Sequence, residues 1–243
     1  MSISRLPEEL PSVLKKAHLT RDYRLVSELL DKHSLVDVED HTFFNNLNEK
    51  SNVLDLGAWK GNFAQKMVEQ FGCCVDVFEP NRNQIKILQE KFENSDRVAV
   101  YPYAVGGENA SVTFYPSPDD YPGNEKGSSL MTSSPYVDES FKYVVEKKRL
   151  ADISEFTKNE SYDLIKMDIE GAELEVFNDP KSVEFLCRSS MLSIEFHYKM
   201  PINDQVLITE QEINNMIRKL ADAGFTYVDF GRNFRFIDCL FYK

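Results

Sequence analysis

The sequence lacks the features that mark several classes of protein. It has four cysteines among 243 residues, and Cys73 and Cys74 are adjacent, so neither a disulfide framework nor a zinc site is indicated. There is no apolar run of membrane-spanning length, and the polar, proline-bearing amino terminus does not resemble a signal peptide. We therefore expect a cytoplasmic protein without a membrane span.

Basic residues are also scarce. The chain has 28 Lys and Arg against 40 Asp and Glu, a net charge of −12. The basic run Lys147 to Arg149 directly follows Glu146, so an acidic residue partly offsets its positive charge. A nucleic-acid substrate is therefore disfavoured. The length suits one large or two small domains, and the apolar fraction of 42% allows a substantial core.

The most informative stretch covers residues 52–62. Val53, Leu54 and Leu56 predict a strand that is buried on both faces, and Gly57 ends it. From Gly61 onwards, apolar residues recur at spacings of three and four, which predicts a helix. A strand, a glycine turn and a helix form the first half of a βαβ unit, and such turns bind ligands at the carboxyl edge of a sheet.

The spacing of the glycines indicates the kind of ligand. A dinucleotide site needs a second glycine two positions after Gly57, where this chain has Trp59, which argues against NAD. The pattern Asp55, Gly57, Gly61 instead resembles the loop of S-adenosylmethionine-dependent methyltransferases. That resemblance implies a loop around the methionine end of the cofactor, with its ammonium near Asp55 and contacts from Gly57, Ala58, Trp59, Gly61 and Asn62. The alternative is an ordinary strand-to-helix turn.

A second strand, residues 73–78, leads into Glu79 and Pro80. An acidic residue at this distance from the first loop binds ribose hydroxyls in these folds, and a carboxylate can accept two O–H bonds from a cis-diol. We expect Phe78, Glu79 and Pro80 to contact the cofactor; the alternative for Glu79 is a solvated residue that caps the following helix. Residues 98–103 predict a third strand, after which Tyr103 and Ala104 are candidates for the adenine contact.

Other segments carry weaker signals. Residues 1–50 have apolar side chains at helical spacing and predict an N-terminal helical cap, ahead of a domain that spans 51–243. His18, His33 and His41 lie in this segment without nearby metal-ligand partners. Gly106 and Gly107 predict a hairpin turn before a surface strand at 110–115. The long loop at 116–135 is a candidate substrate lid.

A second polar stretch runs from Tyr162 to Glu173. A buried run ends in Lys166, Asp168 and Glu170, which period-two spacing puts on one face of an extended chain. Two acids and a lysine are poorly suited to a core and well suited to a polar site. Further on, residues 192–196 predict a fifth parallel strand, 210–223 a helix, and 225–230 with 234–242 a final strand pair.

Six short motifs together resemble one family. In chain order they begin at Asp55, Phe78, Tyr103, Gly127, Lys166 and Ile194, and the most specific is Lys-Met-Asp-Ile-Glu-Gly-Ala-Glu at 166–173. They are similar to the FkbM family of S-adenosylmethionine-dependent O-methyltransferases. This resemblance implies an α/β fold with a doubly wound, seven-stranded, mostly parallel Rossmann-like sheet whose last strand is antiparallel. It also implies methylation of a hydroxyl on a sugar, glycan or polyketide. Trp59 and Lys60 depart from the smaller residues that are more usual there.

The chemistry of methyl transfer suggests catalytic roles. An alcohol must lose a proton, and His197 and Asp168 follow the fifth and fourth strands, where the methyl group is expected. With an ordinary pKa of about 6.5, His197 is the expected neutral base at cytosolic pH, with Lys166 and Glu170 beside it. Asp168 is a weaker base and is better suited to bind the ammonium of the cofactor, or a metal. The alternative for His197 is a neutral residue that hydrogen-bonds the substrate or a loop carbonyl. Asp168, Glu170, Glu195 and His197 also form a candidate site for a divalent metal such as Mg²⁺.

Alternative functions remain open at this stage. A non-catalytic S-adenosylmethionine-binding scaffold would keep the fold, and a methyltransferase for another small-molecule acceptor would keep the cofactor site. The sequence specifies neither the acceptor hydroxyl nor the oligomeric state.

Overall fold

The computed structural model describes residues 35–116, 142–157, 159–197, 201–202, 206–232 and 236–243. Its strands are β1 (Leu35–Val38), β2 (His41–Phe44), β3 (Asn52–Leu56), β4 (Cys74–Phe78), β5 (Val98–Tyr101), β6 (Ala104–Gly106), β7 (Ala110–Phe114), β8 (Tyr143–Arg149), β9 (Leu164–Met167), β10 (Met191–His197), β11 (Pro201–Ile202), β12 (Val206–Leu207), β13 (Thr226–Arg232) and β14 (Phe236–Tyr242). Its helices are α3 (Asn62–Phe71), α4 (Arg82–Phe92), α5 (Ser154–Thr157), α6 (Glu173–Asn178), α7 (Pro180–Leu186) and α8 (Glu210–Asp222), with a 3₁₀ turn at Leu150–Asp152.

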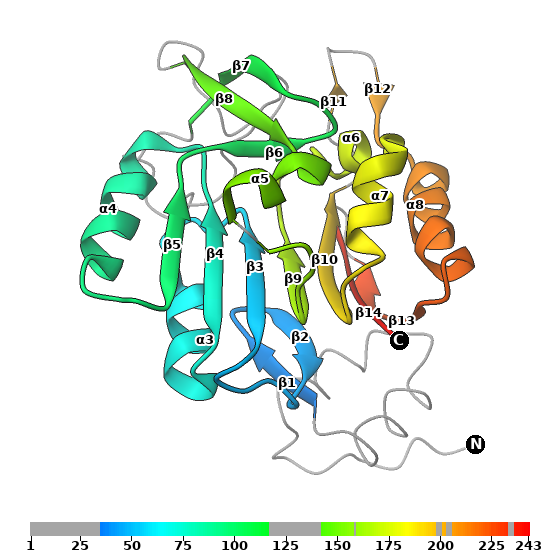
Figure 1. Ribbon diagram of the computed structural model, residues 1–243. Coiled ribbons are helices and arrows are strands. Elements are labelled where there is room, and N and C mark those ends of the chain that lie inside the picture. Colours follow the sequence, from blue (N-terminus) through cyan, green and yellow to red (C-terminus); the bar gives the residue numbers. More distant parts are fainter. Residues whose placement is uncertain (1–34, 117–141, 158, 198–200, 203–205, 233–235) are drawn as a thin grey trace, which may run out of the picture.

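The main sheet has seven strands in the order β13-β14-β10-β9-β3-β4-β5 (Figure 1). Strands β10, β9, β3, β4 and β5 are parallel, and β14 is antiparallel to both of its neighbours. This confirms the predicted doubly wound, mostly parallel sheet. The chain runs outward from β3 to β5 and then returns to β9 on the other side of β3. The ligand crevice of such a sheet lies at that reversal, outside the carboxyl ends of the strands.

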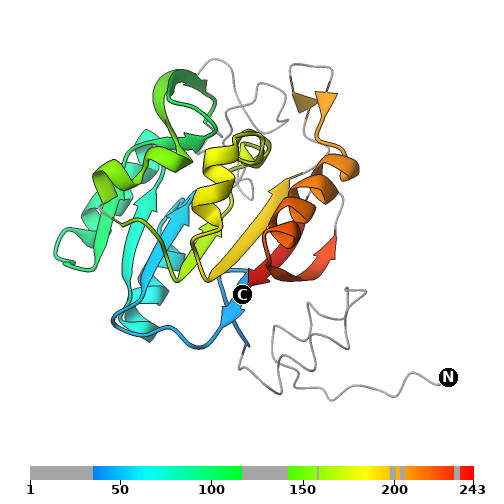
Figure 2. The ribbon, with the colours of Figure 1, turned by 45° about the vertical axis from the view of Figure 1, so that its right-hand side comes forward.

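Helices cover both faces of the sheet (Figures 1 and 2). Leu54 and Leu56 of β3 pack into the core cluster that contains α6, α7 and α8, whereas Val53 packs into the cluster with α3 and α4. Because side chains alternate along a strand, Asp55 lies on the α3 face. Lys166 and His197 share that face, since Leu164 and Met191 at the starts of their strands pack into the α3 cluster. In the described ranges no helix has the length and apolar character needed to cross a membrane.

A small sheet lies beside the carboxyl ends of the main strands, in the order β6-β8-β7 (Figure 1). Strand β8 is parallel to β6 and antiparallel to β7. The expected hairpin turn at Gly106 and Gly107 is therefore wrong, because β8 inserts between the two strands that this turn connects. The predicted third strand is also shorter than expected, since β5 ends at Tyr101 and Ala104 already belongs to the small sheet. Most of the candidate lid at 116–135, with Gly127, lies outside the described residues.

The expected helical cap at residues 1–50 is wrong where the structure describes it. Strands β1 and β2 form an antiparallel hairpin, and Val38 pairs with His41 across a two-residue turn. Both turn residues, Glu39 (φ 49°) and Asp40 (φ 69°), have positive φ, the geometry that suits a tight hairpin. Asn-Gly is the usual signal for such a turn, and this acidic pair does not give it. Phe43 and Phe44 are buried, with ring contacts to Phe71 and Tyr242.

The turn after β3 passes very close to the end of β9. A Cβ atom on Gly57 would lie 1.8 Å from the carbonyl oxygen of Asp168, and Gly57 has a φ of +81°. The amide N–H of Gly57 donates to the carbonyl of Phe78, and that of Asp168 donates to the carbonyl of Leu56. The turn is therefore tied to both neighbouring strands. Glycine is required here by the backbone of the protein itself, whatever ligand binds.

Gly57→Ala should consequently destabilise the fold as well as abolish cofactor binding. The overlap with Asp168 forces a backbone shift, and we expect a loss of at least about 3 kcal/mol in the free energy of unfolding. Gly224→Ala is the matched control, because Gly224 also has positive φ (+94°) but nothing lies within 4 Å of its added Cβ. It should cost about 1 kcal/mol from backbone strain alone. Urea unfolding that gave equal losses for both variants would contradict the close approach.

Candidate functional site

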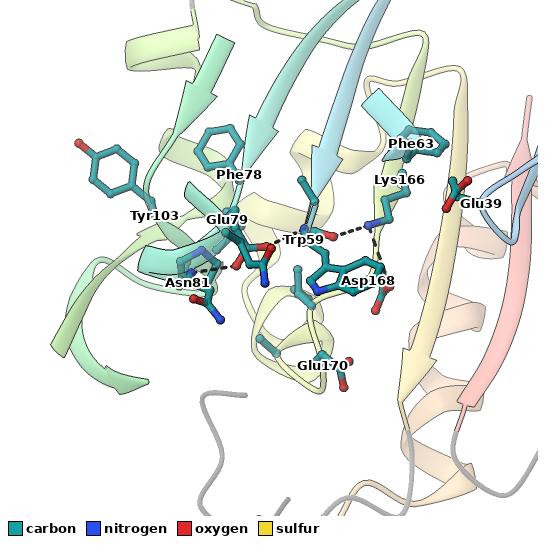
Figure 3. A pocket seen from close by; sticks show the side chains of 18 of the residues that line it. Glu39, Trp59, Phe63, Phe78, Glu79, Asn81, Tyr103, Lys166, Asp168 and Glu170 are labelled. Carbon is teal, nitrogen blue, oxygen red and sulfur yellow. Dashed lines mark hydrogen bonds and ion pairs between the residues drawn. The ribbon is translucent and has the colours of Figure 1, made fainter. Parts of the chain in front are cut away.

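A cavity of about 150 Å³, open at its mouth, lies at the carboxyl ends of β3, β4 and β9. Figure 3 shows aromatic and acidic side chains from these strand ends around it. Most of the predicted site residues line it, namely Gly57, Ala58, Trp59, Asn62, Phe78, Glu79, Pro80, Tyr103, Ala104, Lys166, Asp168 and Glu170. The structure thus brings together residues that are more than a hundred positions apart in the chain.

Asp55, Gly61 and His197 are not among the lining residues. A Cβ on Gly61 would meet Leu88 and Phe92 of α4, so this glycine allows close helix packing. Asp55 is fully buried, and Lys166 Nζ lies 3.2 Å from its Oδ1. The expected contact between Asp55 and the cofactor ammonium stays a prediction, and in the structure the partner of Asp55 is Lys166. Burial raises the pKa of Asp55, and the charge of Lys166 opposes that rise.

Lys166 holds the glycine turn in place. Its Nζ donates to the carbonyl of Gly57 at 2.5 Å, and it lies 4.0 Å from Oδ2 of Asp168. Burial opposes its charge, but Asp55 and Asp168 outweigh burial and raise the pKa of the ammonium. A lysine that keeps its proton cannot be a base. Of the expected catalytic set, Lys166 thus has a positioning role.

Glu79 lies at the end of β4 and is 6% exposed. Its Oε2 accepts the amide N–H of Trp59, and its Oε1 accepts that of Asn81, both at 2.8 Å. Glu79 is therefore not a solvated residue, and it connects the turn after β3 to the start of α4. Burial raises its pKa to about 7, against the smaller opposing effect of these two N–H groups.

Aromatic side chains form flat walls beside Glu79. The ring of Phe78 stacks on that of Tyr101, with centroids 4.8 Å apart. Trp59 has a positive φ of 50°, and Lys60 Nζ lies 4.4 Å above its ring. Tyr103 is a lining residue of the cavity, and Lys148 Nζ lies 4.8 Å from its ring centre. Such faces suit a planar heterocycle, and the carboxylate of Glu79 suits hydroxyl donors.

A buried polar cluster lies next to the cavity around His197. Nδ1 of His197 is 3.0 Å from Glu173 Oε1, and Nε2 is 3.1 Å from Glu195 Oε1. Glu170 Oε2 and Asp168 Oδ1 lie 3.5 and 3.7 Å from Nε2.

This environment decides the charge of His197. Burial disfavours the charged imidazole, but Glu173 and Glu170 together with Glu195 raise its pKa well above 6.5. The expectation of a neutral His197 at cytosolic pH, based on its ordinary pKa, is therefore wrong among these side chains. Burial also raises the pKa of Glu170, to about 7, despite the opposing charge of His197, and it raises that of Glu195.

The sequence did not predict that the β1–β2 hairpin contributes residues to the cavity. Glu39 and His41 both line the cavity, and Nδ1 of His41 lies 3.3 Å from Ser193 Oγ on β10. The ring of His41 meets Phe63 edge-on at 5.8 Å. No local motif marks these residues, because the hairpin must first pack on β10. Further lining residues outside the expected set are Phe63, Asn81, Gln84, Val105, Phe114, Ile169 and Ala172.

The sheet order, the antiparallel β14 and a cavity at the point where the chain reverses define the class, a Rossmann-like methyltransferase. The sequence model of the methyltransferase FkbM domain matches residues 55–227, so the chain belongs to this family of S-adenosylmethionine-dependent methyltransferases.

Two relatives are informative. The 2-O-methyltransferase NoeI of Sinorhizobium fredii (strain NBRC 101917 / NGR234) is 27% identical over 158 residues, which cover 59% of this chain and 62% of that protein. A crystal structure of the FkbM methyltransferase from Methylobacillus flagellatus KT matches with a TM-score of 0.54 at 15% identity, over 95% of this chain and 58% of that one. The chain therefore spans less than two thirds of either relative.

The buried pair Asp55 and Lys166 can be tested directly. Lys166→Met leaves the fully buried carboxylate of Asp55 without an opposite charge and should cost about 3–5 kcal/mol of unfolding free energy. Adding Asp55→Asn should recover much of this loss, and urea unfolding of the four proteins gives the coupling energy. Strictly additive losses would show that the two side chains do not interact.

Proposed function

We propose that the protein transfers a methyl group from S-adenosylmethionine to a hydroxyl of a sugar, glycan or related natural product. The observation that carries this proposal is that the two ends of the cavity have different side chains. One end has aromatic walls and the carboxylate of Glu79, and the other has Asp168 and Glu170. The similarity to a 2-O-methyltransferase supports an oxygen acceptor, and the acidic residues suit a hydroxyl donor.

The residues of the cavity fit S-adenosylmethionine. The rings of Phe78 and Tyr103 suit the adenine, the carboxylate of Glu79 suits the ribose hydroxyls, and the turn at Gly57 suits the methionine end. When bound, the cofactor supplies an electrophilic methyl group on a sulfonium centre. Lys166 cannot be replaced by a neutral group without releasing the turn, because it pairs with Asp55 and donates to the carbonyl of Gly57.

The protein's own tasks in the reaction are alignment, exclusion of water and removal of a proton. Asp168 and Glu170 follow β9 and line the cavity, so their carboxylates are placed to accept the proton of the acceptor hydroxyl. Glu173 fixes the ring of His197 through Nδ1 and thereby holds the opposite edge of that ring towards both carboxylates. His197 is a positioning residue in this scheme.

A methyl-transfer assay tests the proposal. Purified protein with radiolabelled S-adenosylmethionine should label an oligosaccharide acceptor, and analogues that lack single hydroxyls should identify the position. Glycans from cells with and without the protein, compared by mass spectrometry, give a second route. Binding of S-adenosylhomocysteine without labelling of any acceptor would favour the non-catalytic scaffold. Labelling confined to amines or to non-carbohydrate alcohols would overturn the sugar acceptor.

Glu79 makes the affinity for S-adenosylhomocysteine depend on pH. The carboxylate form accepts hydroxyl bonds better than the protonated form, and its pKa lies at about 7. Since a proton competes with the ribose, affinity should rise with pH, by about tenfold between about pH 6 and about pH 8. Calorimetric titrations across this range measure the slope.

Glu79→Gln should bind more weakly and lose the pH dependence, because an amide does not titrate. Glu93→Gln is the control, since Glu93 is exposed just after α4. It should keep the parent's slope. If the affinity of Glu79→Gln for S-adenosylhomocysteine still rose with pH, another group would be responsible for the pH dependence, and Glu79 would not bind the ribose.

A further inference from the structure

The cluster around His197 has the arrangement of a metal site. The orientation of the His197 ring is fixed from one side, because the fully buried Glu173 accepts a hydrogen bond from Nδ1 at 3.0 Å. The same Oε1 accepts the amide N–H of Ile169 at 3.2 Å, which holds Glu173 in turn. Histidines that bind metals characteristically donate one ring N–H to a carboxylate, so that the other nitrogen faces the ion.

Three carboxylates converge on the other nitrogen of the ring. Glu195 Oε1, Glu170 Oε2 and Asp168 Oδ1 lie 3.1, 3.5 and 3.7 Å from Nε2, and they come from β10 and from the turn after β9. A single N–H group makes one good hydrogen bond, whereas one cation can bind the ring nitrogen and all three carboxylates.

Negative charge is concentrated in the cluster. With Glu173, four carboxylates lie around one imidazole, and the ammonium of Lys166 is 4.0 Å from Asp168. A cation bound among the carboxylates is one of the ways in which proteins compensate charge at buried positions.

The separations also fit a single ion. Ligand atoms on an octahedral ion with metal–ligand distances of about 2.1 Å lie about 3.0 Å apart at neighbouring positions and about 4.2 Å apart at opposite ones. The three distances from Nε2 of His197, 3.1, 3.5 and 3.7 Å, fall in this range, and ligand atoms of Asp168, Glu170 and His197 all lie within 4.8 Å of one another. Oxygen ligands with one imidazole favour Mn²⁺ or Mg²⁺ over softer metals that select thiolates.

We propose that Asp168, Glu170, Glu195 and His197 bind one divalent cation, with Mn²⁺ as the probe ion. Such a cation would bind beside the cavity wall that carries Asp168 and Glu170 and would lower the pKa of an acceptor hydroxyl. Carboxylates alone are weak bases for a hydroxyl, since even water has a pKa of about 15.7. This catalytic consequence rests on the proposed function, whereas the binding of the ion does not.

Titration of EDTA-treated protein with Mn²⁺, followed by EPR, tests the site without any assay of activity. The sharp spectrum of aqueous Mn²⁺ should disappear up to one equivalent of protein, Mg²⁺ in excess should restore it, and Mn²⁺ should raise the melting temperature. Glu170→Gln and Glu195→Gln should each weaken binding at least about tenfold, and the double variant at least about a hundredfold. Glu184→Gln is the control, because Glu184 is 68% exposed on α7, whose buried residues pack on the other face of the sheet; it should bind like the parent.

The outcomes separate the metal site from the cofactor site. A parent protein that leaves the Mn²⁺ spectrum and its own melting temperature unchanged overturns the proposal, as does equal binding by the double variant and Glu184→Gln. Should the double variant unfold, the two single variants and the parent titration decide the question. S-adenosylhomocysteine titrated into the same EDTA-treated protein reports on the cofactor site. If S-adenosylhomocysteine binds and Mn²⁺ does not, the metal-site proposal is overturned and the proposed methyltransferase function is unaffected.

Discussion

The site depends on one buried ion pair. Lys166 on β9 and Asp55 on β3 lie opposite each other in the parallel register, with Nζ of the lysine 3.2 Å from Oδ1 of the aspartate. The lysine also reaches past the end of β3 to the carbonyl of Gly57. Strand pairing alone fixes a turn only up to its last hydrogen bond. The N–H of Gly57 is bonded to the carbonyl of Phe78, and the lysine adds a bond to the carbonyl of Gly57, in the backbone that borders the cavity.

Polar groups on the α3 face of the sheet follow a gradient of burial. Asp55 and Lys166 are buried, Glu195 is 15% exposed at its side chain, and Asp168 and Glu170 are 30% and 26% exposed. The groups that need a fixed charge are therefore inside, and those that can exchange a proton or a ligand are at the opening. The other face of the sheet, which is covered by α6, has no such polar gradient among the residues of its core cluster, which is apolar and includes Phe177 and Phe196.

Much of this could be predicted from the sequence where local pattern and chemistry coincide. The turn at Gly57, Glu79 and the run from Lys166 to Glu170 each combine a strand end with polar residues, and the structure places all of them at the cavity. The errors have a common origin. The charge of His197 was assigned from its intrinsic chemistry, but burial and neighbours set it, and neighbours such as Glu173 come from other elements. The hairpin was missed because its turn residues, Glu39 and Asp40, adopt positive φ without glycine or asparagine.

That hairpin lies outside residues 55–227, the part of the chain that the family's sequence model matches. Yet Glu39 and His41 line the cavity, and Phe43 packs edge-on against Phe63 on the helix that follows the cofactor turn. Part of the cavity wall is thus made by residues that precede the matched segment. Two enzymes with the same methyl-transfer machinery can therefore differ in what they admit simply by carrying different chain ahead of the domain.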